Sequence, residues 1–156
     1  MNSLRRTFLK GAGATGAVAV ALSAGLLTPG QVFANEWNKA AFDAKGIMDA
    51  LKGINASSAT DSKDIAIKAP DIAENGAVVP VEVSSKIPGT ESIAIVVEKN
   101  DRPLIAVFNM LNGAEGFVST RIKMAQTSDV KVIVKAGGKM YTAKKEVKVT
   151  IGGCGG

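Results

Sequence analysis

The sequence predicts a mainly β protein, an antiparallel β-sandwich with one N-terminal helix and a flexible C-terminal tail. Three observations lead to this prediction. Apolar residues recur with helical spacing only in residues 37–51, and further along the chain they alternate with polar residues, as in half-buried strands. Turn-forming dipeptides separate these alternating runs, and the chain ends in Gly-Gly-Cys-Gly-Gly.

The first 34 residues predict a cleaved export signal. The pair Arg5-Arg6 precedes a weakly apolar, alanine- and glycine-rich stretch, residues 11–27, which is typical of a twin-arginine signal peptide. Small residues before and at Ala34 favour cleavage after Ala34. A retained membrane helix is the weaker alternative, because the stretch falls short of ~20 strongly apolar residues. We therefore expect a periplasmic protein with no membrane span after cleavage. Three segments are predicted: the signal peptide 1–34, a helix-plus-sandwich domain 35–151 and a tail 152–156.

Composition excludes several classes of function. Signal cleavage removes three of the 19 basic residues and none of the 14 acidic ones, so the net charge falls from +5 to +2. No basic stripe with interleaved aromatic residues is present, which argues against nucleic-acid binding. The chain has no histidine, so the usual general base and most transition-metal sites are absent. We expect no catalytic residues, no bound cofactor and no metal.

One helix is predicted near the start of the mature chain. Its apolar positions follow the i, i+3, i+4, i+7 spacing of one buried stripe. Asn35 is a candidate N-cap and Gly53 a candidate stop. The stripe is expected to pack on the domain or on a partner, and a polar linker, residues 55–62, follows it. The stripe consists of Trp37, Ala40, Ala41, Ala44, Ile47, Met48 and Leu51.

Beyond the linker the hydrophobic period changes to two, which predicts strands. The pair Gly137-Gly138 stands between two alternating runs and predicts a two-residue hairpin. About seven short strands at regular spacing favour an immunoglobulin-like sandwich. A parallel α/β sheet is disfavoured because no strand alternates with a helix. The predicted strands lie at residues 65–69, 79–83, 93–97, 104–109, 117–124, 130–134 and 139–151.

The only cysteine, Cys154, lies in the glycine tail, so it cannot form an intrachain disulfide. Glycine pays the highest backbone entropy on ordering, and a glycine run therefore extends from a fold rather than packing into it. At ~3.3 Å per residue, five extended residues reach roughly 16 Å. We interpret Gly152, Gly153, Gly155 and Gly156 as a flexible arm that presents the thiol of Cys154 to other proteins. An ordinary frayed terminus is the alternative, but an idle exposed thiol would be an oxidation liability.

Nothing near Cys154 in the sequence activates its thiol, so the chemistry must come from other proteins. Lys144, Lys145 and Lys148 precede the tail on the last predicted strand. They either attract anions to the exit of the tail or simply form a solvated strand face. The second interpretation is favoured, because Lys148 alternates with two apolar valines.

The ending of the chain, residues 148–156, resembles that of the SoxY family, the sulfur-carrying subunits of the periplasmic thiosulfate-oxidising (Sox) system. Three internal segments are similar as well, and the resemblance covers nearly all of the mature region. They are Ala69-Pro70-Asp71-Ile72-Ala73-Glu74-Asn75-Gly76, Val97-Glu98-Lys99-Asn100 and Ser119-Thr120-Arg121-Ile122-Lys123-Met124.

This resemblance implies a non-catalytic carrier whose Cys154 is the covalent attachment site for sulfur intermediates. A c-type haem enzyme would couple thiosulfate to the thiol, and a manganese-dependent hydrolase would release sulfate and leave a persulfide. A sulfane dehydrogenase, where present, would process that persulfide. The resemblance also implies a complex with a SoxZ-like subunit.

Two other functions stay open on the residues alone. The Gly155-Gly156 terminus would suit a carrier activated by ATP to a thiocarboxylate, although export away from the cytoplasm argues against it. The chain could also be a structural module of the cell envelope in which Cys154 forms an intermolecular disulfide.

Overall fold

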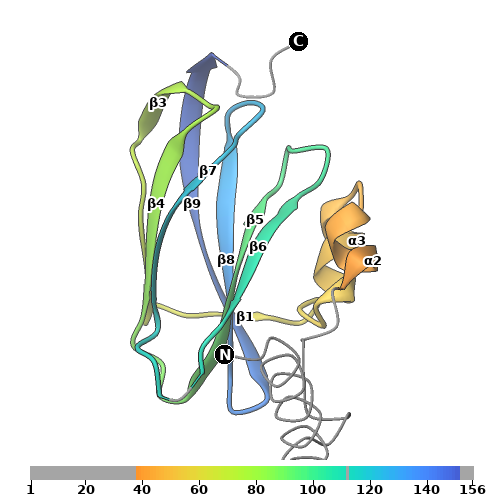
Figure 1. Ribbon diagram of the computed structural model, residues 1–156, viewed down its shortest axis with the longest axis vertical. Helices are drawn as coiled ribbons and strands as arrows, with labels where there is room; N and C mark the ends of the chain where they lie inside the picture. The colour runs from red at the N-terminus through yellow and green to blue at the C-terminus, as the bar shows by residue number, and fades with distance from the viewer. Residues whose placement is uncertain (1–37, 112, 152–156) are drawn as a thin grey trace, which may run out of the picture. The chain divides into compact units, whose positions relative to one another are not determined.

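Two sheets pack face to face in the computed structural model, which describes residues 38–111 and 113–151 (Figure 1). The smaller sheet has the strand order β2-β4-β7, and both of its strand pairs are antiparallel. Its strands are β2 (Ile65–Lys68), β4 (Val79–Ser85) and β7 (Phe117–Ile122). The larger sheet has the order β1-β9-β8-β5-β6, with β3 also paired to β9. Its strands are β1 (Thr60–Asp61), β3 (Ile72–Asn75), β5 (Thr90–Val97), β6 (Leu104–Asn109), β8 (Ser128–Ala136) and β9 (Lys139–Ile151).

The main core lies between the two sheets. In a strand, every second side chain points to the same face, so alternating valines and isoleucines meet there. Full burial of each such side chain stabilises the fold by about 1.5–3 kcal/mol. Ten of these residues have an exposed fraction of 0%: Val79, Val81, Val83, Ile93, Ile95, Val97, Val130, Val132, Val134 and Val147.

Two short helices, α2 (Lys39–Asp43) and α3 (Ile47–Gly53), cover the other face of the larger sheet, beside β5 and β6 (Figure 1). They form a second apolar cluster with that face, so the larger sheet is buried on both sides there. The buried members of the cluster are Ala41, Ala50, Leu51, Ala56, Ala94, Val96, Leu104 and Ile133.

The prediction of one continuous helix over residues 37–51 is wrong. The backbone is extended at Gly46, with φ −125° and ψ 146°, and this break separates α2 from α3. The two helices pack closely enough that a Cβ at Gly53 would lie 2.6 Å from that of Ala41. Two small residues, the buried Ala41 and the half-buried Gly53, can therefore lie in close contact, which a single straight helix would not allow.

The helix boundaries are partly confirmed. α3 ends at Gly53, as predicted. The N-cap of α2 is Asn38, whose Oδ1 accepts a hydrogen bond from Ala41 N at 3.1 Å and whose Nδ2 donates to Gly53 O at 2.6 Å. The predicted cap Asn35 and the stripe residue Trp37 lie outside the described residues. Met48 is 59% exposed, so its place in the buried stripe is wrong.

The mainly β, antiparallel prediction is confirmed, and all seven predicted runs are strands. At Gly137 and Gly138 φ is +55° and +72°, as a two-residue type I′ hairpin requires. Sequence patterns missed β1 and β3, which pair with β9 in parallel. Both are short and mostly exposed, so they carry no hydrophobic alternation. The immunoglobulin-like assignment stays a prediction.

The predicted signal peptide, residues 1–34, and the predicted tail, residues 152–156, lie outside the described residues. The segment boundaries therefore stay predictions. Within the part of the chain that is described, neither helix has the length and apolar character needed to cross a bilayer.

Candidate functional site

The predicted attachment residue Cys154 and the glycines around it, Gly152, Gly153, Gly155 and Gly156, lie outside the described residues. The structure describes instead the strand that leads to them. β9 ends at Ile151, three positions before Cys154. We call the end of β9 and the segments hydrogen-bonded to it the arm base.

β9 is held on both sides as it approaches its end. On one side β8 pairs with it as far as Ser128, which lies opposite Val147. On the other side β3 pairs with its last residues, in the register Ile72↔Lys148, Ala73↔Val149 and Asn75↔Ile151. β3 thus supports β9 beyond the point where β8 stops. β3 was not predicted from the sequence, and so this support was missed.

The hydroxyl of Thr127 extends the ladder past the end of β8. Its Oγ1 accepts a hydrogen bond from Val149 N at 2.9 Å and donates to Val149 O at 3.5 Å. This one side-chain oxygen therefore pairs with the N–H and C=O of Val149, which a longer β8 would have met with its backbone. A threonine in a predicted loop gives no sequence signal for this role.

Hydrogen bonds continue to the last described residue. Thr150 Oγ1 donates to Glu74 O at 2.8 Å. The carbonyl of Ile151 accepts from Gly76 N at 2.8 Å, and the carbonyl of Gly76 accepts from Met124 N at 2.7 Å. Ile151 O is consequently fixed to the loop after β3, and that loop is fixed to the connection between β7 and β8.

Asn100 links the connection between β5 and β6 to the connection between β7 and β8. Its Nδ2 donates to Lys123 O at 2.8 Å, and its Oδ1 accepts from Ala125 N at 2.9 Å. In the sequence, Asn100 was named only as the last residue of a segment that carries the family resemblance. Its side chain in fact brackets the backbone on both sides of Met124, which is fully buried.

The three internal segments that carry the family resemblance all contribute to the arm base. Asp71 in the first accepts a hydrogen bond from Lys148 N at 3.0 Å, and Gly76 ends that segment. Asn100 ends the second, and Met124 ends the third. These segments are far apart in the sequence, and they meet at the end of the sandwich where β9 stops (Figure 1).

Lys144, Lys145 and Lys148, the three lysines in the second half of β9, do not form one cationic cluster. Lys144 and Lys148 lie on one face of the sheet and Lys145 on the other, because side chains alternate along a strand. Lys144 Nζ lies 2.9 Å from Asp129 Oδ2, and this hydrogen bond raises the pKa of Lys144. Lys145 Nζ lies 3.0 Å from Asp71 Oδ1 and donates to Ala69 O at 2.6 Å. This arrangement favours the interpretation of a solvated, ion-paired strand face.

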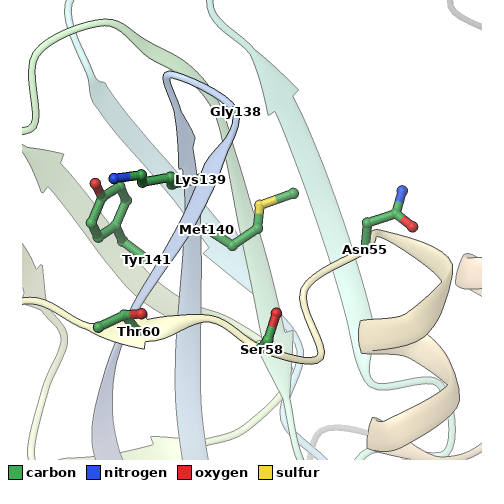
Figure 2. Close-up of a pocket in the computed structure, with 7 residues that line it drawn as sticks. All are labelled: Asn55, Ser58, Thr60, Gly138, Lys139, Met140 and Tyr141. Carbon is green, nitrogen blue, oxygen red and sulfur yellow. The ribbon is translucent and has the colours of Figure 1, made fainter.

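A groove of about 490 Å³ lies at the opposite end of β9, between the hairpin and the linker after α3 (Figure 2). Its polar side chains are mostly exposed, and it is ten residues along β9 from Ile151, or about 33 Å in an extended strand. The groove is therefore separate from the arm base. It is lined by Asn55, Ser58, Thr60, Gly138, Lys139, Met140 and Tyr141.

Comparisons with known proteins identify the family. A family model described as "Sulfur oxidation protein SoxY" matches residues 51–154, more than half of the chain. The solved structure of the sulfur carrier protein SoxY from Chlorobium limicola f thiosulfatophilum is similar, with 45% sequence identity and a TM-score of 0.58. That match covers 67% of this chain and 96% of the other.

A second solved structure, the endo-beta-1,4-mannanase from Thermotoga petrophila, matches at 12% identity with a TM-score of 0.40, over 67% of this chain and 23% of that one. This likeness is too weak to support an argument about fold or function. No curated protein sequence gives a significant match. The family model and the carrier structure together establish that this chain belongs to the SoxY family of sulfur oxidation proteins.

Proposed function

We propose that this chain carries sulfur intermediates covalently on the thiol of Cys154 and presents them to partner enzymes on an arm formed by residues 152–156. The chain itself performs no catalysis in this proposal. The thiol supplies an attachment point, and the partner enzymes supply the chemistry.

One observation carries the proposal: the hydrogen-bond network of the fold reaches the carbonyl of Ile151, three residues before the only cysteine. A fixed base gives a short tail a defined origin. Three residues extend ~10 Å at ~3.3 Å each, so the sulfur can leave the surface of the sandwich and enter a narrow active site. Glycines on both sides have no side chain to clash with the walls of such a site.

Family membership supports the same proposal. The family match extends to residue 154 and thus includes the cysteine. The similar protein from Chlorobium limicola is a sulfur carrier by its title. Exposed apolar side chains at the arm base, Ile72 (59%), Val78 (56%) and Ile151 (68%), provide an apolar surface on which different enzymes can dock.

The loading step is an oxidative coupling. The thiol of Cys154 loses its proton, and its sulfur bonds to the outer sulfur of thiosulfate to give a cysteine S-thiosulfonate. Two electrons leave, and the c-type haem enzyme that couples thiosulfate to the thiol would accept them one at a time. In the next step water attacks the sulfonate sulfur at a manganese-dependent thiosulfohydrolase. The bond between the two outer sulfurs breaks, sulfate departs, and a persulfide stays on Cys154 for a sulfane dehydrogenase or another acceptor.

The proposal places this chemistry in the periplasm, together with a SoxZ-like partner subunit. The predicted twin-arginine signal, residues 1–34, would direct the chain there. The surface charge left after cleavage is small, so we expect partner recognition by shape and apolar contact more than by long-range electrostatics.

The test is intact-mass measurement of the purified mature protein after incubation with thiosulfate and the coupling enzyme. We expect a mass increase that a thiol reductant removes completely. Peptide mapping should place the added group on Cys154. Cys154→Ser should show no increase, with an unchanged unfolding curve, because residue 154 lies beyond the last strand.

Other outcomes would favour the rival functions. Sulfur added to the terminal carboxyl of Gly156, and retained by Cys154→Ser, would indicate a thiocarboxylate carrier. A reductant-sensitive dimer with no added sulfur group would indicate a structural module with an intermolecular disulfide. Either result would contradict the proposal.

A further inference from the structure

β6 is an edge strand whose protection against strand addition is limited to one bulge near its start, where its register against β5 shifts. Within the described residues it pairs only with β5. Its sequence, Leu-Ile-Ala-Val-Phe-Asn, contains no charged residue and no proline. Uncharged apolar edges of this kind present unpaired backbone groups to any strand that can reach them.

The other edges of the two sheets are protected. β7 carries the exposed Arg121, and β2 carries the exposed Lys68. β1 and β3, which flank β9, are only two and four residues long. Charges, short length and bulges are the usual means of preventing strand addition. β6 has one bulge, but with six residues and no charge it is the least protected edge that the structure describes.

The side chains of β6 are incompletely buried on both faces of the sheet. Ile105 and Phe108 pack against the core between the sheets, and Val107 packs against the helix-covered cluster. All three are only half-buried, although their types are among the most often buried in proteins. A further strand beside β6 would cover both rows at once.

The backbone of β6 leaves hydrogen-bonding groups directed outward. Met110 N donates to Glu91 O at 2.8 Å, which identifies these two as a hydrogen-bonded pair. Such pairs alternate in an antiparallel ladder, so the pair Ile93↔Phe108 is also of this type and the pair Ser92↔Asn109 is not. The N–H and C=O of Val107 and Asn109 therefore point away from β5. Asn109 itself is exposed.

We propose that β6 is a strand-addition site, at which the partner subunit pairs an extended, uncharged strand of its own with Val107 and Asn109. The identity of the partner as a SoxZ-like subunit rests on the proposed function, whereas the surface is assigned from β6 alone. An incoming charged strand would bury its charge against an uncharged one, so the chemistry selects a neutral, apolar strand.

This location suits a carrier. β6 and β9 lie three strand spacings apart in the same sheet, or about 14 Å at ~4.8 Å per spacing. A partner added at β6 would extend the larger sheet and leave the arm base open to enzymes. In this arrangement the partner subunit would stay bound at β6 while the arm, residues 152–156, enters the active sites of other proteins.

The test compares three variants of the mature chain in binding the purified SoxZ-like subunit. Asn109→Pro removes an outward N–H without touching the ladder to β5. We expect its dissociation constant to rise about tenfold or more, from a lost hydrogen bond and a clash of the ring with the incoming strand. Asn109→Ala keeps the N–H and should stay within about twofold of the wild type. Ser119→Pro makes the same change at the outward position of β7 and should also stay within about twofold.

A fourth variant keeps the test valid if Asn109→Pro fails to fold. Asn109→Lys retains the whole backbone and adds a charge beside the incoming strand, so it should weaken binding several-fold with an unchanged circular dichroism melt. If neither Asn109→Pro nor Asn109→Lys weakens binding, or Ser119→Pro weakens it equally, the β6 assignment is wrong and the carrier proposal is untouched.

Two further results would also overturn the inference. A wild-type chain that binds no SoxZ-like subunit would remove the partner assignment, while loading of Cys154 would still test the carrier function separately. A wild-type chain that is dimeric alone, and monomeric as Asn109→Pro, would show that a second copy occupies β6.

Discussion

The two ends of β9 are held in different ways. At the arm base, β3, Thr127 and the loop containing Gly76 supply hydrogen bonds up to the carbonyl of Ile151. At the hairpin end, β1 contributes only the pairs Thr60↔Tyr141 and Asp61↔Thr142. The side chains of Asn55, Ser58 and Thr60 make no hydrogen bond there within the described residues.

This difference shows that the backbone of β9 is fixed more firmly at the arm base than at the hairpin end. A tail can present its thiol reproducibly only if the residue before it is fixed, because every degree of freedom at the base adds to the positional spread of the tip. The hairpin end has no such requirement. Three predictions test this contrast. The first two compare a residue of the arm base with a residue at the hairpin end, and the third concerns the hairpin end alone.

The largest effect is expected for Asn100→Ala. The change leaves Lys123 O and Ala125 N without their side-chain partners, next to the buried Met124. We expect a loss of about 1–3 kcal/mol in the free energy of unfolding, measured by urea titration. The matched variant is Asn55→Gly, because Asn55 has φ +57°, which glycine adopts readily, and should change stability by less than about 0.5 kcal/mol. Equal losses for the two variants would contradict the contrast.

A smaller effect is expected for Thr127→Val, which keeps the shape of the side chain but removes its hydroxyl. Val149 N then loses its acceptor, and the expected cost is about 1–2 kcal/mol. Amide hydrogen exchange at Val149 should accelerate selectively. Thr60→Val, at the other end of β9, should leave both stability and exchange unchanged within about 0.5 kcal/mol. Unchanged exchange at Val149 in the Thr127 variant would show that the hydroxyl does not support the strand.

The smallest effect concerns the ion pair at the hairpin end. Lys135 Nζ lies 2.8 Å from Glu91 Oε2, and this hydrogen bond, with a further one from Gly138 N, lowers the pKa of Glu91. A carboxyl group with a lowered pKa in the folded state stabilises the fold above its unfolded pKa, and this contribution is lost as the pH falls through the folded value. Both side chains are 43% exposed, so the change in stability should be slight.

The measurement for this pair is an NMR titration of the Glu91 carboxyl. In Lys135→Met its pKa should rise toward the ordinary glutamate value but remain below it, because Gly138 still donates. Lys144→Met, which removes the partner of Asp129 instead, serves as the control and should leave the Glu91 titration unchanged. A Glu91 pKa that is the same with and without Lys135 would contradict the assignment.

Strands with strong local signals could be predicted from the sequence. Residues 104–109 and 139–151 match β6 and β9 at both ends. The first is a short, almost wholly apolar run, and the second alternates in hydrophobicity and follows the turn Gly137-Gly138. The helix prediction placed the element correctly but missed its break, because the apolar spacing continues across Gly46. Only the packing of Gly53 on Ala41 explains why the chain turns there.

The candidate site likewise has one part that the sequence predicts and one part that it does not. Cys154 and its glycines could be identified from the sequence, because an isolated cysteine in a glycine run is a local signal. The arm base could not, because Thr127 and Asn100 act on backbone groups 22 to 25 positions away. No local pattern encodes which distant carbonyl or N–H a side chain will meet.

The sequence by itself determined the alternation of the core strands, the glycine hairpin and the chemical nature of the tail, since each depends on neighbouring residues. Only the tertiary structure decided that β3 supports the last residues of β9 and that β6, within the described residues, pairs on one side alone. Those two facts depend on which strands lie side by side, and strand order follows from packing of the whole chain rather than from any one segment.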